Sequence, residues 1–304
     1  MLLVRPPARW KLAQVAFYVN RFSALPRAQR VFNKVQRGTF VRRKLFGYDF
    51  VCDVGRDGPQ KLLYLLGERY LEEAYIIRRL VKPGMRVVDV GANIGYYVLL
   101  FAQLVGSDGS IIAVEPSPEN LPELELNVTS NNLCNVQIVP KAIGAEKGNV
   151  GLLSGINSGV TTDAQAAFVV EQDIIDHLAI DPVDFLKIDI EGYELQALYG
   201  ASRVISEDRP ILLLEVHPVH IVQFGGSVDR VFEFLSEFYD NIDVFAPADP
   251  GGPIGKAISY YGGRGVEEIT ERAVYVQRCL NGGVSRPFWV VCRNAALKAK
   301  VKRP

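Results

Sequence analysis

The sequence predicts an α/β domain in which helices cover both faces of a mostly parallel sheet. Apolar segments of strand length alternate with helical segments over residues 86–238, and a glycine-containing turn follows the first of these strands. Alternation of this kind is typical of parallel sheets, because each connection between parallel strands usually carries a helix. A length of 304 residues with 48% hydrophobic residues allows one large domain with a sizeable core.

The expected elements follow from hydrophobic periodicity and from the turn residues between them. Strands are predicted at residues 86–90, 111–114, 136–139, 184–188, 211–216, 242–245 and 288–292. Helices are predicted at residues 71–80, 96–104, 119–130, 174–178, 193–204 and 228–238. Two glycine-containing segments without periodicity, residues 148–165 and 246–265, are candidate binding loops or lids.

The N-terminal region is strongly basic. Residues 1–50 hold eleven Lys and Arg side chains against a single acid, although the whole chain has no net charge. We predict amphipathic helix over residues 1–45 and a short β region near residues 47–54. The chain is therefore divided into a basic helical arm with a short β region (residues 1–60) and a main domain (residues 61–304).

Two functions are open for the basic arm. It either packs on the domain with a solvated basic face, which we favour, or makes a peripheral contact with an anionic membrane or acidic partner. No nucleic-acid motif is present, and nothing in the sequence indicates an oligomeric state. The four cysteines form no C-x-x-C pair, and no apolar run is long enough to span a bilayer. We therefore expect reduced thiols and a cytoplasmic protein, with peripheral membrane attachment as the alternative.

The turn DVGANIGYY predicts a ligand site at the carboxyl end of the first central strand. Gly91 and Gly95 allow a tight turn and remove side chains that would block a ligand. The spacing departs from the G-x-G-x-x-G of dinucleotide sites, and no P-loop lysine is present. Asp89 would repel a diphosphate and attract the amino group of a methionine moiety. The turn therefore fits S-adenosylmethionine better than NAD.

Acidic residues follow the other central strands as well. Glu115, in VEPSPEN, is placed to accept hydrogen bonds from both ribose hydroxyls, although it would also suit a helix start. FLKIDIEGYE brings Asp189 to the end of a later strand, and LLEVHP brings Glu215 and His217 to the end of the next. Because these strand ends share one edge of a parallel sheet, the acids are expected to lie near the cofactor.

In this order, the segments DVGANIGYY, VEPSPEN, KAIG, LKIDIEGYE and LLEVHP resemble the FkbM family of S-adenosylmethionine-dependent methyltransferases over residues 71–218. The resemblance implies a class I methyltransferase fold, a Rossmann-like sheet of seven strands with the last strand antiparallel. It also implies methylation of a hydroxyl group, often on a sugar, glycan or other natural product. The implied cofactor residues are Glu73, Asp89, Gly91, Ala92, Asn93, Gly95, Glu115, Pro116, Ala142 and Ile143.

The remaining candidate residues concern the acceptor. Asp189 has the support of the family signature K-x-D-x-E-G-x-E as general base, and His217 has the more suitable ordinary pKa. The candidate substrate-binding residues are Glu191, Glu194, Glu215, Tyr260 and Tyr261, the last two on a lid. The acids would also suit a magnesium ion, but we do not favour a divalent metal and assign it no ligand.

Two other function classes stay open. The first is an NAD-type oxidoreductase, against which the glycine spacing argues. The second is a non-catalytic glycan- or membrane-associated binding protein on the same fold, which the basic arm would suit.

Overall fold

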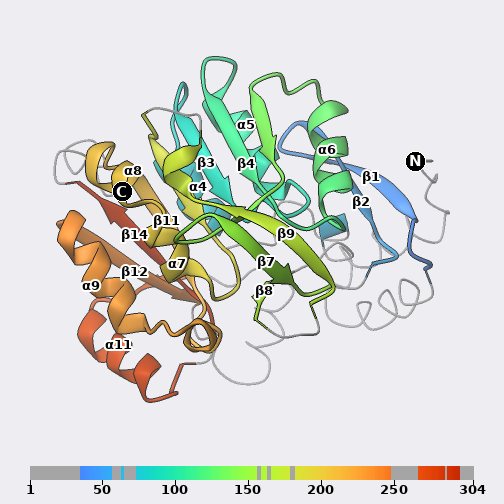
Figure 1. Ribbon diagram of the computed structural model, residues 1–304. Coiled ribbons are helices and arrows are strands. Elements are labelled where there is room, and N and C mark those ends of the chain that lie inside the picture. Colours follow the sequence, from blue (N-terminus) through green and yellow to red (C-terminus); the bar gives the residue numbers. More distant parts are fainter. Residues whose placement is uncertain are drawn as a thin grey trace, which may run out of the picture.

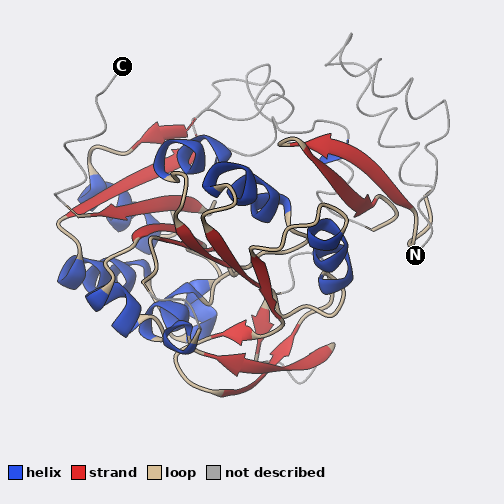
Figure 2. Cartoon of the chain, turned by 90° about the horizontal axis from the view of Figure 1, so that it is seen from above, coloured by secondary structure: helices blue, strands red, loops and turns tan. Residues whose placement is uncertain are grey.

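A large sheet with helices on both faces forms the centre of the molecule (Figures 1 and 2). The computed structural model describes residues 35–56, 63–64, 73–155, 159–162, 166–178, 182–247, 266–284 and 286–294. The sheet has eight strands in the order β13-β12-β14-β11-β10-β3-β4-β5. Among the described residues, no helix is long and apolar enough to cross a membrane.

The strand order is that of a class I methyltransferase. The parallel strands are β3 (Arg86–Val90), β4 (Ser110–Val114), β5 (Val136–Val139), β10 (Phe185–Ile188) and β11 (Ile211–Val216). β14 (Phe288–Arg293) runs antiparallel between β11 and β12 (Asn241–Pro247), and β13 (Val266–Glu268) is added beyond β12. The predicted fold with an antiparallel last strand is confirmed; the extra edge strand β13 was not predicted.

Alternating side chains of the strands pack on the two helical layers. One layer consists of α4 (Glu73–Leu80), α5 (Tyr96–Val105) and α6 (Leu121–Thr129). The other contains α7 (Glu194–Tyr199), α8 (Ser202–Glu207), α9 (Val228–Phe238) and α11 (Arg272–Leu280). In β10, Phe185 joins the first core and Leu186 the second, as expected of a strand buried on both faces.

Two of the predicted helices need correction, and two helical segments were not predicted. The helix predicted over residues 193–204 is divided into α7 and α8, because Gly200 lies against Gly144; a Cβ on Gly200 would be 2.0 Å from that carbonyl oxygen. The segment 174–178 forms a short 3-10 turn, Ile175–His177, and a second such turn is Ile221–Phe224. Helix α11 was not predicted.

A second sheet occupies much of the segment that was predicted to be an irregular loop. Its strands are β6 (Ala142–Ile143), β7 (Gly148–Leu152), β8 (Val160–Thr161) and β9 (Phe168–Asp173), in the order β6-β9-β7-β8. These strands are short and carry glycine and polar residues, so their apolar alternation is weak. The prediction of a loop over residues 148–165 is therefore wrong where β7 and β8 form.

The described part of the N-terminal region is a β-hairpin, β1 (Phe40–Leu45) and β2 (Tyr48–Asp53). The helix predicted over residues 1–45 is wrong at its end, because Val41 and Leu45 are buried and lie on one face of a strand. Residues 1–34 of the predicted arm lie outside the described residues. The hairpin packs on α6, where the backbone N–H of Val51 donates to Asn127 Oδ1 (2.7 Å).

Candidate active site

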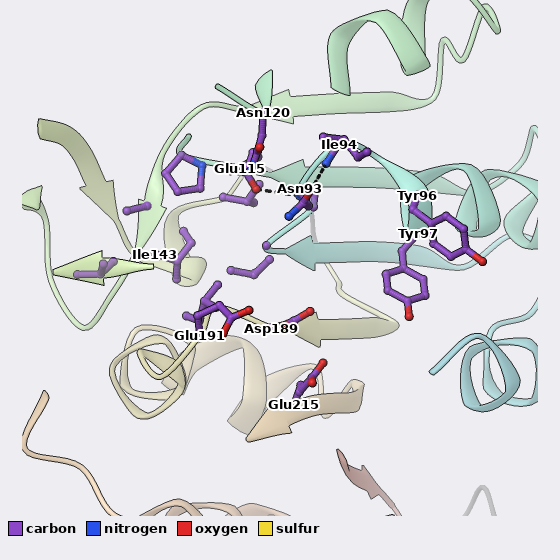
Figure 3. A pocket seen from close by; sticks show the side chains of 18 of the residues that line it. Asn93, Ile94, Tyr96, Tyr97, Glu115, Asn120, Ile143, Asp189, Glu191 and Glu215 are labelled. Atoms are coloured by element: carbon purple, nitrogen blue, oxygen red, sulfur yellow. Dashed lines mark hydrogen bonds between the residues drawn. The ribbon is translucent and has the colours of Figure 1, made fainter. Parts of the chain in front are cut away.

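A cavity of about 300 Å³ lies at the carboxyl ends of β3, β4, β10 and β11 (Figure 3). This is the topological switch point of the sheet: from β3 the chain continues to β4 on one side, and β10, later in the chain, pairs with β3 on the other side. The predicted site residues that line the cavity are Glu73, Gly91, Ala92, Asn93, Glu115, Pro116, Ala142, Ile143, Asp189, Glu191 and Glu215. The topological rule for open α/β sheets thus brings together most of the predicted site.

Other predicted site residues do not line the cavity. Four of them are not among the lining residues: Asp89, Gly95, Glu194 and His217. The side chains of Asp89, Glu194 and His217 are buried. A Cβ on Gly95 would lie 2.9 Å from Leu124, so this glycine serves the packing of α5 on α6. Tyr260 and Tyr261, together with most of the predicted lid, lie outside the described residues.

The glycine turn presses the end of β3 against the end of β10. Gly91 has a φ of +85°, and a Cβ placed on it would be 1.9 Å from the carbonyl oxygen of Asp189. Asn93 is also left-handed (φ 52°), and its Oδ1 accepts a hydrogen bond from the backbone N–H of Ile94 (2.8 Å). Only glycine at residue 91 permits this approach, which places the turn directly beside Asp189.

Glu115 is held by three hydrogen bonds at one side of the cavity (Figure 3). Its Oε2 accepts from the backbone N–H of Asn93 (2.8 Å), and its Oε1 accepts from the N–H of Ser117 (3.0 Å) and from Asn120 Nδ2 (3.1 Å). Burial nevertheless raises the pKa of Glu115 to about 7, and these hydrogen bonds only partly oppose it. Each carboxylate oxygen has further acceptor capacity for a ligand hydroxyl.

A lysine is buried at the other side, beneath Asp189. Lys187 is 1% exposed, and its Nζ lies 3.3 Å from Asp189 Oδ2, 3.6 Å from Asp89 Oδ1 and 5.0 Å from the centre of the Tyr97 ring. Burial opposes its charge, but the charges of Asp189, Asp89 and other nearby carboxylates more than offset this and raise the pKa of Lys187. Lys187 is therefore a permanent internal cation.

The cofactor-binding role of Asp89 stays a prediction, and the structure gives this residue a second partner in Lys187. The side chain of Asp89 is fully buried, and β10 pairs with β3 so that Lys187 stands directly opposite it. Its carboxylate is directed to the ammonium group of Lys187 and does not reach the cavity wall. In this structure Asp89 is thus a partner of Lys187, in addition to the role as a ligand of the methionine amino group that the sequence predicts.

Glu73 and Glu215 form a second pair of carboxyl groups beside Lys187. Burial raises the pKa of both groups; the negative charges of Asp189 and Glu73 add to this effect at Glu215, whose pKa lies well above the ordinary value. Lys187 partly opposes the increase in each case. Glu215 therefore keeps its proton to a higher pH than an exposed glutamate does, which reduces the negative charge in this part of the wall.

His217 is surrounded by carboxylates from the turn after β10 and from β11. Its Nδ1 lies 2.7 Å from Glu194 Oε1, and its Nε2 lies 3.4 Å from Glu191 Oε2 and 3.9 Å from Glu215 Oε1. Burial opposes its charged form, but the hydrogen bond and the charge of Glu194, together with neighbouring acids, raise the pKa of His217 to about 9. His217 therefore carries a positive charge at neutral pH, which makes it a poor proton acceptor.

Asp189, Glu215 and His217 could hold a metal ion by distance alone, since one ligand atom of each lies within 4.8 Å of the others. Lys187 and His217 already supply positive charge to these carboxylates. These two cations offset part of the negative charge of the cluster.

Sequence reasoning missed several residues of the site. Tyr97 and Asn120 line the cavity, and Lys187 was noted only as part of a signature, with no function assigned. A lysine within an otherwise apolar strand was a usable signal, because a buried lysine needs a carboxylate partner. Asn120 offered no comparable signal, since asparagine is common at helix starts.

Two protein-family models match the sequence. The model described as the methyltransferase FkbM domain matches residues 89–241, about half of the chain. The model described as protein-L-isoaspartate(D-aspartate) O-methyltransferase matches residues 16–146, a smaller share.

Individual relatives give weaker similarities. A protein-L-isoaspartate O-methyltransferase of Caenorhabditis elegans is 27% identical over 141 residues, 45% of this chain and 54% of the relative. One from Arabidopsis thaliana is 39% identical over 56 residues, 18% of this chain and 24% of the relative. The chain thus spans about half or less of these relatives. A methyltransferase FkbM structure from Methylobacillus flagellatus has a TM-score of 0.40 at 19% identity, with coverage of 72% of this chain and 54% of that one.

Proposed function

Because this chain belongs to the FkbM methyltransferase family, we propose that it transfers a methyl group from S-adenosylmethionine to a hydroxyl group. The family, the class I fold and the cofactor class predicted from the sequence motifs are confirmed by this membership. The acceptor that we propose is a sugar, a glycan or another hydroxylated natural product, and Asp189 is the residue that receives its proton.

The described residues fit S-adenosylmethionine. The carboxylate of Glu115 suits two ribose hydroxyls, and Ala142 and Ile143 supply a small apolar surface suited to an adenine ring. At the other side, Glu73 Oε1 has no hydrogen-bond partner among the described residues and suits an ammonium group. When bound, the cofactor supplies an activated methyl group, and the cavity orients it toward the acceptor.

The position of Asp189 supports the proposed role most directly. Its carboxylate stands at the cavity wall at the end of β10, across from Glu115 (Figure 3). Lys187 donates to Oδ2 from beneath and fixes the side chain. His217 is the less suitable base, since its pKa of about 9 leaves it protonated at neutral pH. We assign His217 the task of holding Glu191 and Glu215 in place.

The charge of the wall bears on the kind of acceptor. Glu73, Asp189, Glu191 and Glu215 meet at the side of the cavity away from Glu115. Glu215 keeps its proton to a higher pH, and Lys187 and His217 offset part of the charge, but the carboxylates that stay ionised would still disfavour an isoaspartyl carboxylate, the acceptor that the second family model suggests. A neutral hydroxyl group would not meet this repulsion. An NAD-type oxidoreductase is less well supported still, because Glu115 and the turn beside it offer no diphosphate site.

Two measurements on the purified protein test the proposed function. Calorimetric titration should show saturable binding of S-adenosylmethionine and none of NADH. Mass spectrometry should then find a methyl ether after incubation with a panel of neutral sugars and polyols, with an isoaspartyl peptide alongside. Methylation of the peptide alone would replace the hydroxyl acceptor with a carboxyl group. Tight binding without any product would favour the non-catalytic alternative, and selective NADH binding would overturn the proposal.

Cofactor affinity is expected to increase with pH across about pH 7. The pKa of Glu115 without ligand is about 7, and ribose hydroxyls donate hydrogen bonds to its ionised form. Below about pH 7 the carboxyl group is mostly protonated and must lose its proton before it binds the ribose. The dissociation constant should therefore increase about tenfold for each pH unit below that value. Calorimetry from about pH 5.5 to 8.5 checks this. The variant Glu115→Gln should show weak binding without the pH dependence, and a flat profile for the unaltered protein would exclude Glu115 as the ribose ligand.

We further propose that the protein acts in the cytoplasm on a small-molecule or glycan acceptor. A peripheral contact of the basic arm with an anionic membrane or partner stays a prediction, because residues 1–34 lie outside the described part of the chain. The described cysteines are free thiols.

A further inference from the structure

We propose that Arg56, in the turn that follows the N-terminal hairpin, is a positioning residue of the cofactor site that acts on Glu115 through the side chain of Asn120. The proposal rests on the function proposed above, since it treats Glu115 as the ribose-binding carboxylate. Arg56 lies outside residues 89–241, the part of the chain that matches the FkbM domain. The inference therefore adds the turn after the hairpin to the parts of the chain that support the cofactor site.

Three buried side chains form a continuous chain of hydrogen bonds from the turn after β2 to the cavity. Arg56 Nη2 donates to Asn120 Oδ1 (2.9 Å), and Asn120 Nδ2 donates to Glu115 Oε1 (3.1 Å). Arg56 is 7% exposed, Asn120 1% and Glu115 4%, so water does not readily replace either contact. Asn120 and Glu115 line the cavity, whereas Arg56 does not.

The chemistry of the three side chains fixes which group donates and which accepts in each of the two hydrogen bonds. A guanidinium group only donates hydrogen bonds, and an ionised carboxylate only accepts them. The amide group of Asn120 connects them, since it has both an acceptor and a donor. Its oxygen accepts from Arg56, so its nitrogen faces Glu115 and donates to the carboxylate. Arg56 thus selects the amide orientation that supports the ionised form of Glu115. The opposite orientation would direct the amide oxygen at the carboxylate and repel it.

Arg56 is itself fixed by the joint between β2 and α6. Its Nη1 donates to Glu123 Oε1 (2.7 Å) and to the carbonyl oxygen of Glu119 (2.9 Å). Glu123 Oε2 in turn accepts from the backbone N–H of Asp53 at the end of β2 (2.8 Å). The guanidinium group therefore donates to Glu123 and to Asn120 at the same time from two different nitrogens. The ammonium group of a lysine has one nitrogen and would not reproduce this arrangement.

A double-mutant cycle on ligand binding tests the proposal. Arg56→Gln, Asn120→Ala and the double variant are titrated calorimetrically with S-adenosylhomocysteine, after circular dichroism has shown each to be folded. Each single change should raise the dissociation constant about tenfold, the usual value of a hydrogen bond to a charged group. Because Arg56 acts through Asn120, the double variant should bind about as weakly as Asn120→Ala alone. The matched control is Arg42→Gln. Arg42 lies on the neighbouring hairpin strand β1 and forms an exposed ion pair with Asp49, so this variant should bind normally.

A pH titration separates positioning from general damage to the hairpin. The hydrogen bond from Asn120 lowers the pKa of Glu115, so its loss in Arg56→Gln should move the midpoint of the Glu115 carboxyl signal in ¹³C NMR to higher pH. This measurement needs no ligand. Arg56→Lys should share the defect, and it serves in place of Arg56→Gln should that variant not fold.

The outcomes are distinguishable. Independent, multiplying effects of the two substitutions, or an unchanged Glu115 titration in a folded Arg56 variant, would overturn the proposed coupling. Absence of ligand binding by the unaltered protein, together with a shifted Glu115 titration in the variants, would refute the proposed cofactor function but leave the link from Arg56 to Glu115 intact.

Discussion

Replacing Asp189 with asparagine is expected to slow methyl transfer by about 10²–10⁴-fold, the usual contribution of a general base, while the affinity for S-adenosylmethionine changes little. Asparagine keeps the size of the side chain and its place at the end of β10 but cannot take up a proton. Lys187 would keep the carboxylate of Asp89 as a partner at 3.6 Å, so the buried lysine is not stranded. The loss should therefore appear in kcat and not in cofactor binding.

The measurement compares single-turnover rates and calorimetric dissociation constants for the unaltered protein, Asp189→Asn and a matched control. Asp229→Asn is the same chemical change on the exposed surface of α9 and should behave as the unaltered protein. A rate close to that of the control would show that Asp189 is not the base. His217→Asn would then be the variant to examine, although the positive charge on His217 at neutral pH makes a large effect on proton transfer unexpected.

The position of the site could be predicted from the sequence because it depends on local patterns. Apolar strands end where acids and glycines begin, and parallel strands bring those ends to one edge of the sheet. Gly91, Glu115 and Asp189 therefore meet at one cavity as expected. The second sheet was missed because β7 and β8 are too short and polar to give a clear period.

The direction of individual side chains could not be predicted in the same way. Asp89 and His217 are both near the cavity, yet each is turned to a partner from another element, Lys187 on β10 and Glu194 on α7. The strand pairing decides that Lys187 stands beside Asp89, and that pairing is a tertiary property. The same holds for Arg56, whose importance appears only once the hairpin is packed on α6.

Replacing Lys187 with methionine is expected to lower the free energy of unfolding by about 3–5 kcal/mol at neutral pH, the usual cost of removing one partner of a buried ion pair. Methionine retains an apolar side chain of similar length, but it loses the contact of the ammonium group with the Tyr97 ring at 5.0 Å. The cost arises because Asp89 is fully buried and would have no opposite charge beside it. Lys147→Met, at a side chain that is 65% exposed, is the matched control.

The loss in Lys187→Met should itself depend on pH. Burial already raises the pKa of Asp89, and Lys187 opposes this, so removal of the lysine raises that pKa further above its value in the unfolded chain. A carboxyl group with a raised folded-state pKa binds its proton more tightly when folded. Its penalty is therefore present above the folded-state pKa and declines as the pH falls toward the unfolded value. Urea unfolding should show a larger difference between variant and unaltered protein at about pH 8 than at about pH 5.

A second substitution identifies the source of the loss. Asp89→Asn in the Lys187→Met background removes the uncompensated charge and should recover part of the stability, most clearly at the higher pH. An equal loss at both pH values, with no recovery from Asp89→Asn, would mean that Lys187 does not stabilise the protein through Asp89 but through other contacts, such as that of its ammonium group with the Tyr97 ring. The double variant could also recover stability without recovering methyl transfer. That result would show that Lys187 has two separable roles: it compensates the charge of Asp89 in the core, and it orients Asp189 at the cavity wall.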